Sequence, residues 1–220
     1  MKVLAMDTAT KAATVAVTED GKLLGEVTLN LNKPHSQKVM PLIEGLLSEL
    51  ELKPSDIDLF ACANGPGSFT GLRIGVAAVQ GLATSVNKQC AGVSTLEAMA
   101  CNYTKITDAC VCPLLDAKRE QVYYALYKGE REIIAPSLET AENVLNQLAC
   151  LGKPVVFVGD AVAVYADRIR VLLPEAKLAP EVFNVNFAYN VATLAQKKVE
   201  MNGESKASPE YLMKSYVDKE

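Results

Sequence analysis

The chain has 220 residues, of which 50% are hydrophobic and 22% are charged, with a net charge of −4 and a pI of about 5.2. This length allows one large domain or two smaller lobes. An acidic chain gains little from neutralising phosphates, so we do not expect it to bind RNA alone. No segment has the roughly 18 consecutive apolar residues of a membrane span, and the start MKVLAMDTAT lacks the apolar region of a signal peptide. We expect a cytoplasmic protein without membrane contact.

Cysteine and histidine content restricts the chemistry. The six cysteines form no C-x-x-C pair, and three lie in apolar runs, which indicates free thiols rather than metal or disulfide chemistry. His35 is the single histidine, so a metal site with two histidine ligands is excluded. The sequence nominates neither a nucleophile nor an orienting carboxylate beside it. We expect His35 at a helix entry or on the surface, and we assign no catalytic residue and no metal ligand.

The first half alternates strands and helices. Apolar periodicity and turn residues predict, in chain order, strands 2–6, 14–17 and 23–30, an amphipathic helix 37–51, a strand within 56–64, a glycine-rich turn, a helix 69–86, a strand 89–93 and a helix 94–101. Pro41 falls in the first turns of helix 37–51, so that helix either begins near it or is bent.

The second half starts the pattern again. Its predicted elements are strands 110–116, 121–127 and 131–135, a helix 138–149, a strand 154–160, helices 161–172 and 187–199, and a polar linker 202–208 before the tail. Asp7 and Asp116 each end a buried strand that a returning strand follows, so the halves share one plan. We predict an α/β protein of two related lobes, 1–104 and 105–208, with the tail 209–220 able to pack back on the first lobe.

The turn ANGPGSFTG, before helix 69–86, raises the question of a phosphate site. It matches neither the Walker A pattern nor G-x-G-x-x-G, and Pro66 removes one backbone N–H. One interpretation is a tight turn with Ser68 or Thr70 capping the helix; the other is an anion site at the helix N-terminus. The residues that such an anion or nucleotide would contact are Asp7, Thr8, Thr10, Gly65, Gly67, Ser68, Thr70 and Arg73.

Helix 69–86 is apolar nearly all round and must be covered all round. Gly71 and Gly75, followed by Ala78, leave a flat groove that a second helix can approach. Burial within the chain and a protein–protein interface remain equal alternatives here. For an interface, the candidate residues on helices 37–51 and 69–86 are Val39, Leu42, Ile43, Leu46, Leu72, Gly75, Val76, Val79 and Leu82.

Six segments together resemble one family. MDTAT, DIDLFACANGPGSFTGLRIG, GVSTLEAMA, LLDAKREQVYYALY, VFVGD and PEYL are similar to the TsaB family, bacterial subunits required to make N6-threonylcarbamoyladenosine on tRNA. The resemblance spans the chain and is strongest across 57–97. It implies the actin-like, Hsp70-like fold of two ribonuclease H-like lobes.

The resemblance also implies lost chemistry relative to TsaD, the related catalytic subunit. Thr95 and Met99 stand where TsaD has two metal-binding histidines, and neither suits a divalent ion. Ala9 replaces a phosphate-wrapping glycine after Asp7, and Asp116 is followed by Ala117. The two aspartates can bind a magnesium nucleotide or be solvated strand ends, and without the glycines we favour the solvated ends. The segment DAKREQ, 116–121, is expected to be a solvated turn.

The family implies a non-catalytic subunit that pairs with a TsaD-like catalytic protein and supports threonylcarbamoyl transfer to adenosine 37 of tRNAs reading ANN codons. It also implies a TsaE-like ATPase as a third component, and ATP or ADP at a partner junction rather than an intrinsic cofactor. We expect helices 37–51 and 69–86 to form the interface with the partner, and the same apolar surface to form a homodimer when the partner is absent. tRNA is expected to bind only through the complex.

Two enzyme hypotheses compete with this one. The first is an ATPase or phosphotransferase of the actin-like superfamily that uses Asp7 and Asp116, and it predicts nucleotide turnover that Asp7→Asn abolishes. The second is a protease, suggested by an old glycoprotease label on the related subunit, and a single histidine makes it the weaker of the two.

Overall fold

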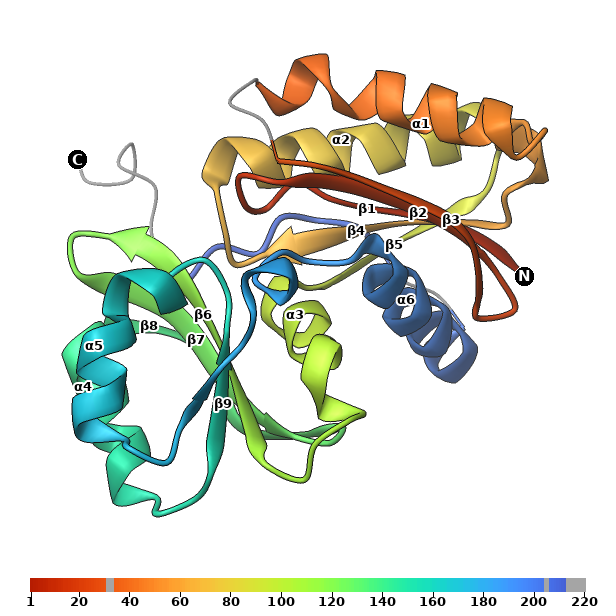
Figure 1. Cartoon of the computed structure of the whole chain (residues 1–220). Helices are drawn as coiled ribbons and strands as arrows, with labels where there is room; N and C mark the ends of the chain where they lie inside the picture. The colour runs from red at the N-terminus through yellow and green to blue at the C-terminus, as the bar shows by residue number, and fades with distance from the viewer. Residues whose placement is uncertain (31–33, 204–205, 213–220) are drawn as a thin grey trace. The chain divides into compact units, whose positions relative to one another are not determined.

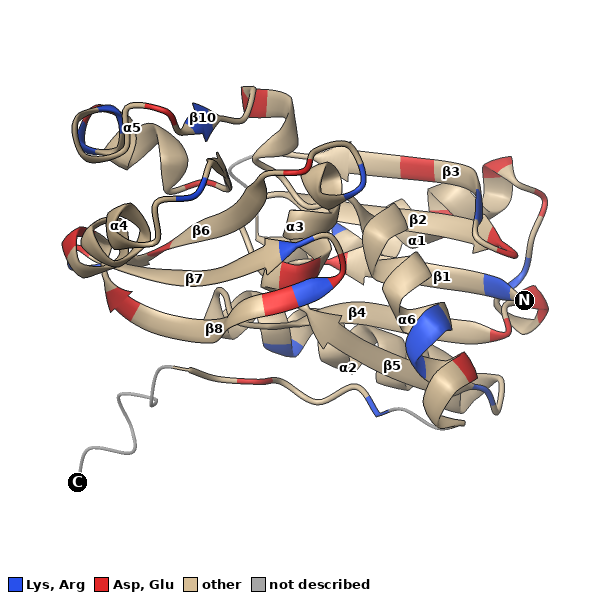
Figure 2. Cartoon of the chain, turned by 90° about the horizontal axis from the view of Figure 1, so that it is seen from below, with Lys and Arg blue, Asp and Glu red and all other residues tan. Residues whose placement is uncertain are grey.

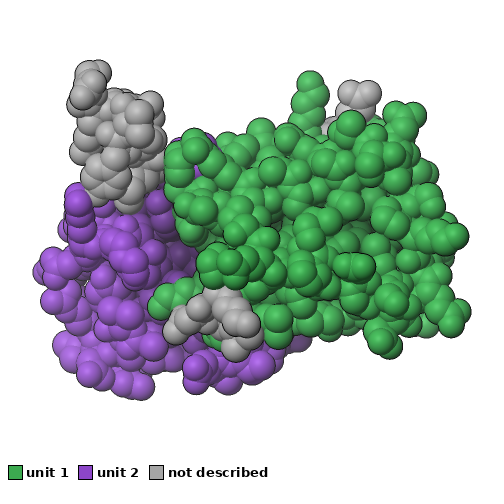
Figure 3. Space-filling view, turned by 90° about the horizontal axis from the view of Figure 1, so that it is seen from above, with its two compact units in different colours: residues 1–98, 186–210 green, residues 99–185, 211–220 purple. Residues whose placement is uncertain are grey.

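A computed structural model describes residues 1–30, 34–203 and 206–212. The chain forms two compact units, which Figure 3 shows in separate colours. The first unit contains Met1–Ala98 and Asn186–Glu210, and the second contains Met99–Val185 and Tyr211–Glu220. Of that last stretch, 213–220 lie outside the described residues. Within the described part of the chain, no helix combines the length and the apolar character that a membrane crossing requires.

The first unit is built on a mixed five-stranded sheet in the order β3-β2-β1-β4-β5. Its strands are β1 Lys2–Asp7, β2 Ala13–Glu19, β3 Lys22–Leu29, β4 Leu59–Gly65 and β5 Gln89–Ser94. β1 pairs antiparallel with β2 and parallel with β4, so it is the central strand. Alternation along β1 sends Leu4 and Met6 to one face and Val3 and Ala5 to the other.

Helices cover both faces of this sheet. α1, Val39–Glu49, and α2, Phe69–Ser85, lie on one face, and α6, Ala188–Asn202, lies on the other (Figure 1). Short 3-10 turns at His35–Gln37 and Pro54–Asp56 precede α1 and β4. Because α1 begins at Val39, Pro41 is its third residue, where its missing N–H leaves no helical hydrogen bond unmade.

A carboxylate from β3 holds the start of α6. Glu26 Oε1 accepts hydrogen bonds from the N–H of Ala188 at 2.8 Å and the hydroxyl of Thr14 at 3.0 Å, and Oε2 accepts one from the N–H of Tyr189 at 3.4 Å. Phe187, the N-cap residue, provides no side-chain cap. Glu26 therefore takes that function from 162 residues away in the chain. Burial raises the pKa of this carboxyl.

The position of α6 differs from the predicted lobe boundaries, 1–104 and 105–208, because this helix belongs to the first unit. α6 presents Val191, Ala192 and Ala195 to the first sheet, so 186–208 does not belong with the second lobe. The first unit also ends at Ala98 instead of 104, within α3, Thr95–Thr104. Strand and helix patterns predict elements, whereas the sheet that a helix covers depends on tertiary contacts.

The second unit repeats the plan with the sheet order β10-β9-β6-β7-β8. Its strands and helices are β6 Cys110–Lys118, β7 Gln121–Lys128, β8 Arg131–Thr140, α4 Ala141–Cys150, β9 Val155–Val158, α5 Val162–Leu172 and β10 Lys177–Leu178, and a 3-10 turn at Glu181–Phe183 follows. Leu145, Leu148, Phe157 and Ile169 lie in one continuous core of this unit.

The internal repeat is confirmed strand by strand. In the first unit the central strand β1 pairs antiparallel with β2 and parallel with β4. In the second unit the central strand β6 pairs in the same way, antiparallel with β7 and parallel with β9. This α/β plan is the predicted fold class. Among the details that differ, the two-residue strand β10 was not predicted, β8 is longer than the predicted strand 131–135, and α4 begins at Ala141 rather than 138. β8 continues to Thr140, whose hydroxyl caps α4 by accepting from the N–H of Asn143 at 3.3 Å.

Candidate functional site

The glycine turn joins β4 to α2 in the first unit. The peptide bond between Gly65 and Pro66 is cis, and Ser68 is the N-cap of α2. The Ser68 hydroxyl accepts a hydrogen bond from the N–H of Gly71 at 3.3 Å, which meets the prediction of a cap at Ser68 or Thr70. The N–H of Ser68 donates to the carbonyl of Ala9 at 2.7 Å. The turn is thus tied to residues 8–12, which we call the β1–β2 turn.

Two glycines of α2 make room for the β1–β2 turn. A Cβ on Gly71 would lie within 3.0 Å of the Thr8 carbonyl oxygen, and a Cβ on Gly75 would lie 2.6 Å from Thr8 Oγ1. The Thr8 hydroxyl donates to the carbonyl of Gly71 at 2.7 Å. The groove predicted for a second helix is therefore wrong at this position, because Thr8 of the same chain fills it.

The two remaining glycines of the turn also contact the chain itself. A Cβ on Gly67 would lie 2.6 Å from the carbonyl oxygen of Ala9. Gly65, with φ of +140°, faces the backbone of Glu210, whose N–H donates to the carbonyl of Asn64 at 2.7 Å. Asn64 also donates from Nδ2 to the carbonyl of Ser208 at 2.9 Å. The start of the predicted tail, 209–210, therefore packs on the first unit; the part from 213 lies outside the described residues.

Asp7 is buried, with 1% of its surface exposed. Its Oδ1 accepts a hydrogen bond from the N–H of Ala9 at 2.6 Å, and its Oδ2 accepts one from Nδ2 of Asn186. Burial raises the pKa of the Asp7 carboxyl to about 6, against the partial opposition of these two hydrogen bonds. The prediction of a solvated strand end was wrong for Asp7, because the chain entering α6 covers it.

Asp116, the repeat counterpart of Asp7, lies in a different environment in the second unit. Its side chain is 28% exposed and forms an ion pair with Lys118. Its backbone N–H donates to Oδ1 of Asp160 at 2.9 Å. Lys118, Arg119 and Glu120 follow it with positive φ and are exposed, as predicted for a solvated turn.

Of the other predicted anion-contact residues, Thr10 and Arg73 contact residues of the first unit. The carbonyl of Thr10 is bonded to His35 Nε2 at 2.8 Å, so that ring nitrogen donates. The Arg73 guanidinium lies 4.0 Å from the centre of the Phe69 ring, and Thr70 is exposed. The N–H groups of Ser68 and Gly71 are bonded to protein oxygens, so these two donors are not available to a phosphate group. The geometry favours packing over phosphate contact.

Most of the predicted interface residues lie in the core of the first unit. Gly75 is buried, and the side chains with at most 6% exposure are Val39, Ile43, Leu46, Leu72, Val76 and Val79. Leu42 and Leu82 are half-buried. For these seven candidate residues the alternative of burial within the chain holds, because the apolar faces of α1 and α2 pack on the sheet and on each other.

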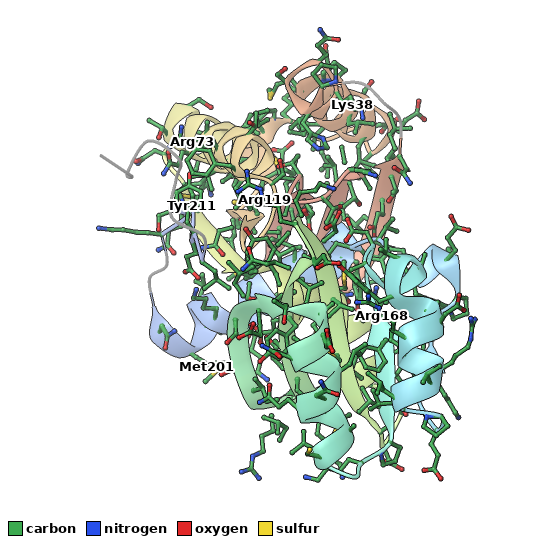
Figure 4. The ribbon with its side chains drawn as sticks, turned by 90° about the vertical axis from the view of Figure 1, so that its left-hand side faces the viewer. Lys38, Arg73, Arg119, Arg168, Met201 and Tyr211 are labelled. Carbon is green, nitrogen blue, oxygen red and sulfur yellow. The ribbon has the colours of Figure 1, made fainter. Side chains whose placement is uncertain are left out.

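The outer faces of α1 and α2 carry small and polar residues instead. Exposed positions on the two helices include Met40, Pro41, Glu44, Gly45, Ser48, Arg73, Ala77, Gly81 and Thr84, and Figure 4 labels Arg73 on α2. Among the described residues, no atom beyond the adjoining residues and the helix's own backbone lies within 4 Å of a Cβ added at Gly45 or Gly81. Sequence reasoning missed both glycines. Placing them on a helical wheel, opposite the apolar stripe, would have found them.

Comparison with known proteins places the chain in context. Residues 22–214 match the family model described as TsaD, tRNA N6-adenosine threonylcarbamoyltransferase. A Bacillus subtilis protein named tRNA threonylcarbamoyladenosine biosynthesis protein TsaB is 33% identical over 177 residues, which cover 79% of this chain and 77% of that protein. The chain belongs to the TsaB family.

Further relatives agree with this family. The TsaB protein of Escherichia coli is 37% identical over 64% of this chain and 61% of that protein. A crystal structure from Pseudomonas aeruginosa, of an uncharacterized protein with similarity to peptidase YeaZ, superposes with a TM-score of 0.83 at 28% identity, covering 96% of this chain and 99% of that one.

The TsaB resemblance assigned Thr95 and Met99 to former metal-ligand positions, and both side chains are fully buried. Across the described ranges, no three His, Cys, Asp or Glu side chains lie close enough to bind a metal ion.

Proposed function

We propose that this TsaB-family chain is an accessory subunit that binds a TsaD-like catalytic protein through the outer faces of α1 and α2. In that complex it supports formation of N6-threonylcarbamoyladenosine at position 37 of tRNAs reading ANN codons. The relatives are named as tRNA threonylcarbamoyladenosine biosynthesis proteins, which supports a role in forming this modified nucleoside. The two outward glycines, Gly45 and Gly81, support the surface.

A glycine inside a helix destabilises it by about 0.5–1 kcal/mol relative to alanine. For Gly71 and Gly75, contact with Thr8 explains why glycine is needed. Nothing in the described part of the chain explains Gly45 and Gly81, where a methyl group would meet open space. A glycine on an exposed helix face lets another backbone approach closely, so a partner polypeptide accounts for what the isolated chain does not. Met40, which is 48% exposed on α1, adds apolar contact area.

The chain's contribution is positional in this proposal. Asp7 is buried and bonded to Asn186, so it does not favour the nucleotide-hydrolysing alternative. We assign no catalytic residue to the chain; its paired helices hold the catalytic partner in an active arrangement. The same surface forms a homodimer when the partner is absent. A TsaE-like ATPase joins the pair, with ATP or ADP at the junction, and tRNA is bound only through the complex.

Size-exclusion chromatography with light scattering, with and without a TsaD-like protein, tests this surface. Gly81→Arg and Gly45→Arg place a long charged side chain on the outer faces and should prevent complex formation, while circular dichroism stays unchanged. Substitutions at Gly75 or Val79 are unsuitable because both residues are buried.

Ala149→Arg is the matched control, since Ala149 is an exposed small residue of a helix in the second unit. It should bind the partner as the unmodified chain does. Normal binding by both glycine variants would overturn the proposed surface.

A further inference from the structure

The outer face of α5 carries exposed apolar residues that the proposed docking surface does not use. Val164 is 67% exposed and Val171 is 78% exposed, and Leu172 beside it is 39% exposed. Val162, Tyr165 and Ile169 occupy the opposite side of the helix and pack into the core of the second unit. The inner side of α5 is therefore fully packed. On its outer side, the exposed Val164 and Val171 lie seven residues apart, which is about two helical turns.

Charged residues lie between the two exposed valines. Asp167 and Arg168 are both exposed, and Figure 2 shows acidic and basic residues together on α5. Arg170 forms an ion pair with Asp167 at 2.9 Å on the same helix. Arg168 is labelled on α5 in Figure 4. The order along the face is therefore apolar, acidic, basic, apolar.

This order is self-complementary. When two α5 helices meet in antiparallel orientation about an axis between Asp167 and Arg168, Val164 of each copy lies opposite Val171 of the other. The same axis places each Asp167 opposite the second copy's Arg168. Interfaces with two-fold symmetry use one patch twice, and here that patch supplies both its apolar pairs and its opposite charges.

The neighbouring helix leaves this face accessible. A groove of about 380 Å³ runs between α4 and α5, lined by Glu142, Leu145, Asp167, Arg168, Val171 and Leu172. Its lining includes Glu142 on α4, which adds an acid near Arg168. A second copy can reach the valines without displacing any element of the second unit.

We propose that α5 pairs antiparallel with α5 of a second copy of this chain, at a surface separate from the outer faces of α1 and α2. One helix pair buries less than the roughly 1,200 Å² of a standard stable interface, so the association is weak and depends on concentration. It is independent of the TsaD-like partner, and it persists when the outer faces of α1 and α2 are blocked.

Charge exchange tests the register. In the full-length chain carrying Gly81→Arg, sedimentation equilibrium should show a weak dimer. In the proposed register, residue 167 of each copy faces residue 168 of the other. Either single reversal, Asp167→Arg or Arg168→Asp, therefore creates two pairs of like charges across the interface and should weaken dimerisation about tenfold. The double variant D167R/R168D restores opposite pairs and should recover the dimer. Arg131→Glu, an exposed reversal on β8, is the control and should change nothing.

Disulfide cross-linking tests the orientation. The variant V164C/V171C, with the exposed Cys150 replaced by serine, should form a covalent dimer on oxidation. The two positions are about 10 Å apart along one helix, too far for a bridge within a chain. Each single cysteine variant, with the same Cys150→Ser change, should form no covalent dimer. A monomer at all concentrations, no recovery in D167R/R168D, or equal cross-linking by the single variants would each overturn the proposal.

Discussion

The first unit uses helix glycines in two opposite ways. Gly71 and Gly75 face inward, and the backbone and hydroxyl of Thr8 occupy the space that a side chain would need. Gly45 and Gly81 face outward into open space. The first pair is explained by the fold and the second is not, so a glycine indicates an interface only after its own chain has been excluded as the neighbour.

The largest expected effect on stability comes from a substitution that disturbs the contact between Gly71 and Thr8. Gly71→Ala places a methyl group against the Thr8 backbone, which belongs to a turn fixed by several hydrogen bonds and cannot move cheaply. We expect the free energy of unfolding to fall by about 3 kcal/mol, measured by urea denaturation. An unchanged midpoint would mean that the β1–β2 turn does not pack on α2.

The second effect concerns Asp7, which anchors the same turn. Its pKa is about 6 in the folded chain, above the ordinary aspartate value of 3.8, so the folded state binds the proton more tightly. The resulting stabilisation is fully present below about pH 4 and is lost as the pH rises to about 6. The stability of the unmodified chain relative to Asp7→Asn should therefore fall by about 2–3 kcal/mol across this window and stay level above it.

Urea denaturation of both proteins from about pH 3 to about pH 8 checks this. Because other carboxyls titrate equally in the two proteins, the difference between them isolates Asp7. A constant difference across the range would contradict the raised pKa.

A third substitution provides a reference on the other face of the sheet. Glu26→Ala removes the acceptor for the N–H groups of Ala188 and Tyr189 and should lower stability by about 1–2 kcal/mol. Glu26→Gln keeps one acceptor oxygen and should lose less. Equal losses in thermal or urea unfolding would show that the cap adds nothing beyond the charge.

The smallest expected effect is a gain in stability rather than a loss, and it tests most directly the difference between the inward and the outward glycines. Gly45→Ala and Gly81→Ala should each raise the free energy of unfolding of the isolated chain by about 0.5–1 kcal/mol, because alanine favours the helix and meets no neighbour. The same urea measurements detect this gain. A loss of stability in either variant would show that the glycine is required internally, like Gly71.

Local sequence patterns predicted most of the fold. Periodicity placed α2 almost to the residue, and the aspartates at the ends of β1 and β6 indicated the repeat. The patterns did not show which sheet α6 covers, because its cap from Glu26 and its packing on the first sheet join residues that are far apart in the sequence. They also did not distinguish Gly75, where an added Cβ would meet Thr8, from Gly81, where it would meet no neighbour among the described residues. Residue type indicates that close approach is permitted, and only the three-dimensional arrangement identifies the neighbour.

The return of α6 to the first sheet has a consequence for biosynthesis. Residues 99–185 form the bulk of the second unit and leave the ribosome before the first unit has all of its parts. The opening strands must wait for α6 and the segment up to Glu210 before their second face is covered. We therefore expect the middle of the nascent chain to fold first, while the N-terminal sheet keeps an exposed apolar surface that chaperones can recognise until translation ends.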